Sequence, residues 1–164
     1  MIRGIHHVAV SVRDIDRMIR FYREAFGFEL VGEEFAWDNE PLMDRIVDVS
    51  GTKARGAMLR SGTVYFELFE YSRPETDSPQ PKRPQDRGYT HFSIDTDDIE
   101  ADLPRLKAAG MTFNDRDAVD MGVAKTLYGY DPEGNIIEVQ QCMPGSGLLL
   151  EDLPHVSPTS AAAG

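Results

Sequence analysis

The sequence has one cysteine, Cys142, one tryptophan, and few basic residues for its length. A lone cysteine excludes an internal disulfide and is typical of a reducing compartment, so we expect a cytoplasmic protein. The 17 Lys and Arg residues against 28 Asp and Glu leave a net charge of −11, which argues against a nucleic-acid partner because phosphate binding requires a positive surface. No apolar run approaches the roughly 20 residues of a membrane-spanning helix, and the first residues lead into a strand pattern rather than a signal peptide. We therefore expect no membrane association.

The 164 residues, with 41% hydrophobic and 27% charged residues, fit one compact domain that buries its own core. We expect that domain to cover residues 1–143. The remaining residues, 144–164, are rich in Gly, Ser, Pro and Ala. They predict a C-terminal tail that is partly disordered.

Two stretches of the chain resemble each other. Residues 7–16 (HVAVSVRDID) parallel residues 91–100 (HFSIDTDDIE), and each predicts a short strand, an acidic turn and a helix. The first helix has apolar residues at i, i+3, i+4 and i+7 spacing, with an expected N-cap at Asp14 and an end at Gly27. The second contains Pro104, which predicts a kink or a late helix start near Asp102.

Strand-like segments follow each helix, and the predicted order is β-α-β-β-β in both halves. The segments are 28–35, 54–60 and 63–71 in the first half, and 111–114, 123–130 and 135–142 in the second. The fold class is therefore α+β, with two βαβββ modules at about 4–71 and 88–142 and a proline-rich linker at 72–87. An insertion between Trp37 and Gly51 is absent from the second half, and residues 41–49 within it predict a short helix.

Two histidines and two glutamates occupy equivalent strands of the two halves: His7 and His91 in the first strand, Glu67 and Glu138 in the last. Strand alternation puts both histidines on faces of small or polar residues, whereas His6 shares the parity of the core valines. A carboxylate flanked by core-facing apolar residues is costly to bury without a counter-ion. Two imidazoles and two carboxylates suit one divalent metal ion, with Zn²⁺, Ni²⁺, Co²⁺, Mn²⁺ and Fe²⁺ all compatible. We predict that these four residues are its ligands.

Taken singly, these residues have simpler interpretations. A lone strand histidine is more often a hydrogen-bonded structural residue, and a lone strand glutamate usually lies on a solvated face; the repeated pattern favours the metal site. Trp37 and Phe35 can line a pocket mouth or belong to the core. Cys142 is interpreted as an ordinary strand-end residue.

Four stretches resemble the vicinal oxygen chelate superfamily, which includes glyoxalase I, methylmalonyl-CoA epimerase, fosfomycin-resistance proteins and extradiol dioxygenases. They are residues 5–10 (IHHVAV), 21–28 (FYREAFGF), 65–69 (YFELF) and 131–138 (DPEGNIIE). The resemblance implies two βαβββ modules that form a cup-shaped open mixed sheet around one metal site, and a possible homodimer. The His, Glu, His, Glu set is most similar to bacterial glyoxalase I. Residues 56–62 are similar to the epimerases, but the catalytic glutamate that precedes them there is missing, with only Asp48 nearby.

The resemblance further implies a metal-dependent isomerase, epimerase or lyase that removes a proton α to the carbonyl of a small-molecule substrate through a metal-stabilised enediolate. Glu67 or Glu138 is the expected general base, Tyr65 a hydrogen-bond donor to a substrate oxygen, and Asp48 a further candidate base. Two alternatives stay open: a binding protein of the bleomycin-resistance type without catalysis, and an Fe(II) ring-cleaving dioxygenase. Metal content separates the first alternative from an enzyme, and oxygen uptake with catechols identifies the second.

Overall fold

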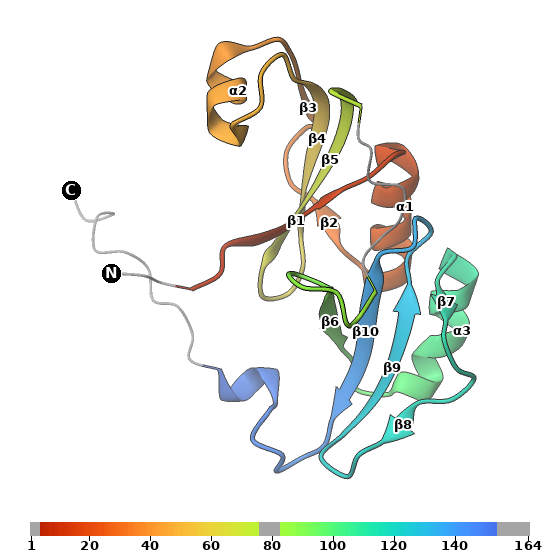
Figure 1. Ribbon diagram of the computed structural model, residues 1–164. Coiled ribbons are helices and arrows are strands. Elements are labelled where there is room, and N and C mark those ends of the chain that lie inside the picture. Colours follow the sequence, from red (N-terminus) through yellow and green to blue (C-terminus); the bar gives the residue numbers. More distant parts are fainter. Residues whose placement is uncertain (1–3, 76–82, 154–164) are drawn as a thin grey trace, which may run out of the picture.

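The structure, a computed structural model, describes residues 4–75 and 83–153 and consists of two similar halves (Figure 1). The first half contains β1 (His7–Ser11), α1 (Ile15–Phe26), β2 (Glu29–Leu30), β3 (Phe35–Asp38), α2 (Pro41–Val47), β4 (Lys53–Arg60) and β5 (Tyr65–Arg73). The second contains β6 (His91–Asp95), α3 (Ile99–Ala109), β7 (Thr112–Phe113), β8 (Val119–Asp120), β9 (Ala124–Tyr130), β10 (Ile136–Cys142) and a 3₁₀ turn, η1 (Leu150–Asp152). The repeated strand, helix and strands confirm the predicted α+β class.

Each half forms its own five-stranded mixed sheet. The orders are β1-β5-β4-β2 and β6-β10-β9-β7, and β3 and β8 also pair with β4 and β9. The β1–β5 and β6–β10 pairs are parallel and the others antiparallel. The predicted open mixed sheet is therefore present as two sheets of matching order, in which β1 and β6 are edge strands.

Both long helices are capped by their own neighbours. Asp14 accepts a hydrogen bond from the backbone N–H of Arg17 at 2.9 Å, and Gly27 ends α1 with a φ of 68°. Both ends of α1 agree with the prediction, since an Asx N-cap satisfies a free N–H and glycine adopts the left-handed conformation without strain. In α3 the same role falls to Asp98, so the predicted late start near Asp102 is wrong.

Pro104 lies inside α3 although it lacks the N–H that would continue the helix. The helix nevertheless buries Ile99, Leu103 and Leu106, and burial of such side chains stabilises the fold by about 1.5–3 kcal/mol each. Tertiary packing therefore outweighs the lost backbone hydrogen bond.

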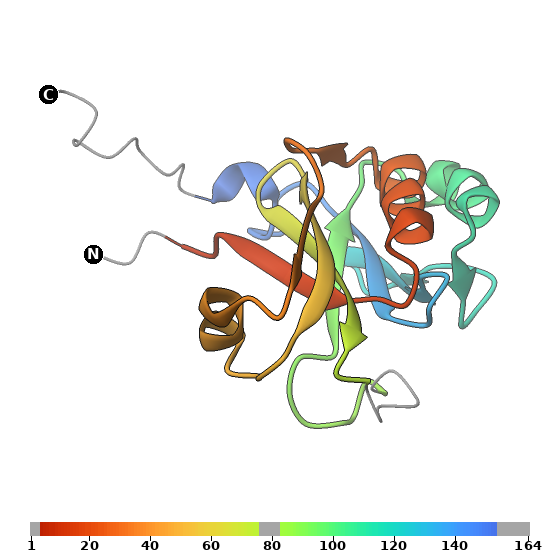
Figure 2. The ribbon, with the colours of Figure 1, turned by 90° about the horizontal axis from the view of Figure 1, so that it is seen from above.

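The core joins the two halves. Helices α1 and α3 lie side by side (Figures 1 and 2), and the aromatic rings of Tyr22 on α1, Phe66 on β5 and Phe92 on β6 contact one another. Tyr22 is fully buried and Phe66 almost so. One hydrophobic core thus spans residues from both modules.

The strands after each helix depart from the prediction in one repeated way. The segment predicted as one strand, 28–35, is two short strands, β2 and β3, and Gly32 between them has a φ of 70°. The second half also has two short strands after its helix: β7 lies within the predicted segment 111–114, and β8 follows it. Strand β8 was missed because two residues carry no detectable alternation. The helix predicted within 41–49 is confirmed as α2.

The described residues include only part of the predicted linker and tail. Residues 76–82 of the linker and 154–164 of the tail lie outside them, so the boundaries of the domain and the disorder of the tail remain predictions. Within the described ranges no helix has the length and apolarity needed to cross a membrane.

Candidate metal-binding site

The four predicted ligands lie on the more open faces of their sheets. Along β1 the exposed residues His7, Ala9 and Ser11 alternate with the half-buried Val8 and Val10. Strand β6 has the same alternation, beginning with an exposed histidine. The two glutamates are each flanked by buried neighbours in β5 and β10. The predicted strand parity is therefore confirmed.

The parallel pairing of β1 with β5 brings His7 and Glu67 together. His7 is in register with Tyr65, two residues before Glu67, and its Nε2 lies 3.5 Å from Glu67 Oε2. In the second half His91 is likewise in register with the residue two before Glu138, and Nε2 of His91 lies 3.4 Å from Oε2 of Glu138. The repeat therefore produces two equivalent His–Glu pairs.

The two pairs are not joined into one cluster. Within residues 4–75 and 83–153, no group of three or more His, Cys, Asp or Glu side chains is close enough to hold a metal ion. Both histidines nevertheless line the same groove, which lies between β1 and β6 and has a volume of about 740 Å³. Its wall includes Val8, Phe92 and Asn135. The structure thus places both histidines at one groove and leaves the pairs separate.

The two glutamates have different surroundings. Burial raises the pKa of Glu67 above its usual value, and the nearby imidazoles of His7 and His6 oppose this shift. Glu138 accepts a 2.5 Å hydrogen bond from Thr126 Oγ1. No hydroxyl donor to Glu67 occurs in the part of the chain that the structure describes. Burial therefore favours the protonated form of Glu67.

Two polar residues of β9 lie next to His91 and Glu138, and the sequence had not pointed to either of them. The two residues are Thr126 and Tyr128. The hydroxyl of Tyr128 lies 3.4 Å from Nε2 of His91. Burial raises the pKa of Tyr128, and the charge of Glu138 adds to this, so the phenol stays protonated. Tyr128 is directly opposite Glu138 in the antiparallel ladder. Alternation along β9 places both residues on one face, but only the register connects that face with Glu138.

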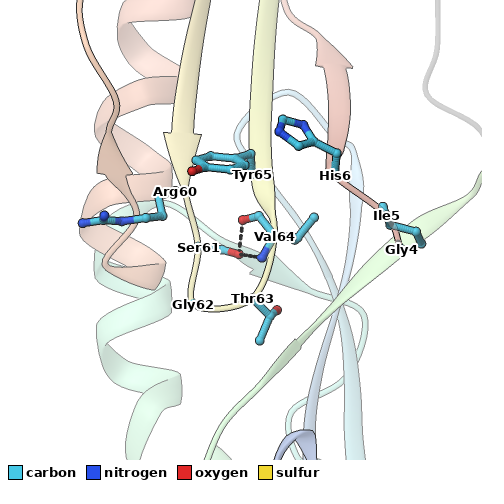
Figure 3. A pocket seen from close by; sticks show the side chains of 9 residues that line it. All are labelled: Gly4, Ile5, His6, Arg60, Ser61, Gly62, Thr63, Val64 and Tyr65. Carbon is cyan, nitrogen blue, oxygen red and sulfur yellow. Dashed lines mark hydrogen bonds between the residues drawn. The ribbon is translucent and has the colours of Figure 1, made fainter. Parts of the chain in front are cut away.

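Tyr65 lies beside the first pair rather than within it. Its ring stacks on that of His6, with centroids 5.0 Å apart and planes inclined by 30°. Figure 3 shows both rings at a smaller pocket of about 380 Å³, formed by the β4–β5 turn and the chain entering β1. The ring stack places Tyr65 next to the histidine that the strand parity had excluded.

The other residues considered from the sequence lie away from the groove. Asp48 ends α2 with a φ of 55° and is absent from the groove wall. Trp37 is buried, and its Nε1 donates a 2.7 Å hydrogen bond to Thr52 Oγ1, which gives it a core role. Phe35 stacks on Trp37 and is 39% exposed. Cys142 ends β10, as expected.

Residues 4–139 match the family described as the Glyoxalase/Bleomycin resistance protein/Dioxygenase superfamily. The match covers most of the chain and agrees with the duplicated βαβββ architecture. The chain belongs to this superfamily, which confirms the resemblance seen in its sequence.

Among curated relatives, the chain is similar to a 2-epi-5-epi-valiolone epimerase from Actinomyces sp, with 39% identity over 110 residues that cover 64% of this chain and 58% of that protein. It is also similar to a lactoylglutathione lyase from Schizosaccharomyces pombe, with 24% identity over 144 residues, or 82% of this chain and 46% of that protein. The chain spans about half the length of these two relatives. A glyoxalase family protein from Bacillus cereus has the same fold, with a TM-score of 0.76 at 20% identity and coverage of 87% of this chain and 95% of that one.

Proposed function

We propose that this chain is a metal-dependent isomerase, epimerase or lyase that removes a proton from a carbon next to a carbonyl group. The proposal depends on one observation: equivalent strands of both halves carry a His–Glu pair, and both histidines line one groove. The similarity to proteins named as an epimerase and as a lyase supports this class of reaction. The substrate we propose is a small 2-oxo compound or another carbonyl compound with an acidic α-hydrogen.

The donor atoms of each pair fit part of a metal coordination sphere. Two ligand atoms about 2.1 Å from Zn²⁺ and separated by a tetrahedral angle lie about 3.4 Å apart. Nε2 and Oε2 are separated by 3.5 Å in the first pair and 3.4 Å in the second. We therefore propose His7, Glu67, His91 and Glu138 as the residues that hold one divalent ion. The mixed nitrogen and oxygen set suits Zn²⁺, Ni²⁺, Co²⁺, Mn²⁺ or Fe²⁺.

When bound, a divalent ion supplies Lewis acidity that stabilises negative charge on substrate oxygens. Glu67 is the proposed general base, because burial favours its protonated form. Its carboxylate takes the α-proton while the electron pair of the C–H bond moves toward the carbonyl. The acid form then returns the proton to the same carbon or a neighbouring one. Glu138, which accepts the Thr126 hydrogen bond, is the proposed second carboxylate, and the Tyr65 hydroxyl remains a proposed donor to a substrate oxygen.

Binding of one ion by all four residues requires the two pairs to come closer together or to combine between copies of the chain. Both histidines belong to edge strands that border the groove. We propose a homodimer as one way of combining a first pair with a second. Size-exclusion chromatography with light scattering, with and without Zn²⁺, distinguishes a dimer from a monomer that closes around the ion.

Metal content tests the ligand assignment. Protein purified without chelator should contain about one divalent ion for each complete set of four ligands, measured by inductively coupled plasma mass spectrometry. His91→Ala and Glu67→Gln should lose that metal. Asp48→Asn serves as a control, because Asp48 lies outside the groove wall. Stoichiometric metal in His91→Ala would contradict the assignment.

Hydrogen exchange tests the reaction. In D₂O, proton NMR should show loss of the α-hydrogen signal from a substrate in a panel of 2-epi-5-epi-valiolone, lactoylglutathione and simple 2-oxo acids. Replacement of a general base typically lowers the rate by roughly 10²–10⁴-fold, so Glu67→Gln should exchange at least that much more slowly. Equal exchange rates for Glu67→Gln and the unchanged protein would rule out Glu67 as the base.

One observation favours a second candidate function, the binding of a small molecule without catalysis. The described residues contain two His–Glu pairs rather than a group of three or more ligands, and a groove of about 740 Å³ has the volume of a small-molecule site. Absence of metal from the purified protein, together with ligand binding that His91→Ala leaves intact, would favour this function.

A further inference from the structure

The smaller pocket, shown in Figure 3, differs in charge from the rest of this acidic chain. It has a volume of about 380 Å³ and is lined by residues 60–65 of the β4–β5 turn and residues 4–6 before β1. Arg60 is the one Arg or Lys among the described residues that line it, and none of them is Asp or Glu, although the chain has 28 of these acids. The lining therefore favours a negatively charged ligand.

Strand register places this pocket beside the candidate metal-binding residues. Arg60 is opposite Tyr65 in the antiparallel β4–β5 ladder, and Tyr65 is in register with His7 of β1. These three residues form one row across the sheet, on the face that also carries Glu67. Because Tyr65 and Glu67 are two positions apart on one strand, their Cα atoms are about 6.6 Å apart. The pocket thus lies one row away from the proposed general base.

The pocket has hydrogen-bond donors that no described protein group uses. Within residues 4–75 and 83–153, the Tyr65 hydroxyl and the backbone N–H groups of Gly62 and Thr63 have no acceptor. The stack on His6 holds the Tyr65 ring, and Figure 3 shows the hydroxyl of Tyr65 on the side of Arg60. Carboxylate and phosphate oxygens accept hydrogen bonds from such donors, and arginine binds these groups through two parallel N–H bonds.

Arg60 has a competing partner in Glu29 of β2. The two side chains form an ion pair in which they are 61% and 65% exposed. An exposed ion pair is weak because water and salt compete for both charges. A ligand anion that also accepts a hydrogen bond from Tyr65 can therefore replace Glu29 at the guanidinium.

The second half lacks this arrangement at the equivalent positions. There His91 is in register with Ile136, and Ile136 is opposite Tyr130. The His–Glu pair is thus repeated, but the row of Arg60 and Tyr65 is not. A site with a charged group at one end only binds a substrate in one direction.

We propose that this pocket binds an anionic group of the substrate, with Arg60 neutralising its charge and Tyr65 donating a hydrogen bond to it. The inference rests on the proposed function and deepens it by naming the substrate class. That class is a carbonyl compound with a carboxylate or phosphate group several bonds away from the carbon that loses its proton. The substrate oxygen bound by Tyr65 then belongs to this anionic group.

Two acids of equal chain length test the proposal. 2-Oxoadipate ends in a carboxylate and 2-oxohexanoate in a methyl group, while both have the same 2-oxo acid group at the other end. In calorimetric titration the full chain should bind 2-oxoadipate at least tenfold more tightly, the usual effect of a hydrogen bond to a charged group. Equal binding of the two acids, or binding of neither, would overturn the proposal. Inorganic phosphate that binds only when Arg60 is present, without a preference between the acids, would assign the pocket to a free anion and would also overturn it.

Substitutions with opposite expected effects identify the residues responsible. Arg60→Met should abolish the preference for 2-oxoadipate but leave the binding of 2-oxohexanoate unchanged, which shows that the fold is intact. Tyr65→Phe keeps the ring stacked on His6 and should reduce the preference several-fold. Glu29→Gln removes the competing carboxylate and should increase the preference by up to about fivefold.

Arg83→Met is the matched control, because Arg83 is an exposed arginine in an ion pair with Asp86 and is absent from the pocket lining. It changes the net charge as Arg60→Met does and should retain the preference. A preference that survives in Arg60→Met, or that Arg83→Met loses to the same extent, would refute the assignment.

Hydrogen exchange in D₂O separates this inference from the proposed function. Arg60→Met should raise KM for 2-oxoadipate at least tenfold and change kcat little, because Arg60 holds the substrate away from its reacting carbon. Preferential binding of 2-oxoadipate without exchange of its α-hydrogens would support the anion site and count against the proposed function. Exchange of both acids with equal KM would support the proposed function and count against the anion site alone.

Discussion

A buried hydrogen bond between Tyr22 and Asp131 holds the two halves together and is open to a quantitative test. The hydroxyl of Tyr22, on α1, donates to Oδ2 of Asp131 at 2.9 Å, and Asp131 is 3% exposed in the turn between β9 and β10. Asp131 also accepts hydrogen bonds from the backbone N–H groups of Glu133 and Asn135 and from the Asn135 side chain. The carboxylate therefore connects a helix of the first half with a turn of the second.

Tyr22→Phe removes one hydrogen bond to a carboxylate and should lower the free energy of unfolding by about 1.5–3 kcal/mol. Asp131→Ala leaves the phenol and two backbone N–H groups without their acceptor, so we expect a loss of about 3 kcal/mol or more. For a chain of this length, 1 kcal/mol corresponds to about 2–4 °C in Tm. Tyr22→Phe should thus melt roughly 3–12 °C below the unchanged protein.

Urea unfolding followed by circular dichroism measures these differences. Tyr89→Phe is the matched control, since Tyr89 is fully exposed and should change stability by no more than about 0.5 kcal/mol. The double variant Tyr22→Phe/Asp131→Ala should lose less than the sum of the single losses, because the two residues share one interaction. Strict additivity, or a Tyr22→Phe variant as stable as Tyr89→Phe, would refute the reasoning.

The same bond predicts a dependence on alkaline pH. Burial raises the pKa of Tyr22 well above its ordinary value of 10.0, and the charge of Asp131 adds to this shift. Because the folded pKa exceeds the unfolded one, this contribution to stability is complete below pH about 10 and decreases above it. Between pH 10 and 11 the unchanged protein should lose stability faster than Tyr22→Phe, by up to about 1.4 kcal/mol per pH unit. Equal slopes would show that the phenol is not held neutral by the fold.

Two further predictions concern the insertion and the sheet of the second half. The hydrogen bond from the Thr52 hydroxyl is the largest cause that lowers the pKa of Asp44, and the backbone N–H groups of Thr52 and Gly51 add to it. The contribution of Asp44 to stability is therefore present above its ordinary pKa of 3.8 and is lost as the pH falls. Because Trp37 donates a hydrogen bond to Thr52, the fluorescence emission of Trp37 should change on acidification, and Asp44→Asn should abolish that change. An unchanged acid transition in Asp44→Asn would contradict this. A Cβ at Gly129 would lie 2.6 Å from a backbone oxygen of β7, so Gly129→Ala should cost about 1–3 kcal/mol in urea unfolding. Gly62→Ala enters open space and should be neutral; similar losses in both would exclude this steric cause.

Several features of the fold were predictable because they depend on neighbours along the chain. The apolar spacing of α1, its Asp14 cap and its Gly27 end involve residues within a few positions of one another. Side-chain alternation likewise predicted which face of β1 carries His7. The start of α3 was predicted wrongly because the local effect of Pro104 suggested a break, whereas the burial of Leu103 and Leu106 favours helix through it.

The candidate site could be predicted only in part. Equivalence of the two halves singled out His7, Glu67, His91 and Glu138, and the structure joins them as two pairs. Tyr128 escaped detection because its position opposite Glu138 depends on the register of two strands. His6 was set aside because parity was extended one residue beyond the strand, which begins at His7.

The sequence by itself determined the duplicated architecture, both ends of α1 and the faces on which the histidines and glutamates lie. These features follow from the 3.6-residue and two-residue periods of the backbone, which operate between residues close in the chain. Tertiary structure alone decided which side chain meets which: the distance within each His–Glu pair, the bond from Tyr22 to Asp131 and the separation of the two pairs. Such contacts depend on strand register and on the packing of α1 against α3, where side chains distant in sequence settle the arrangement by shape and burial.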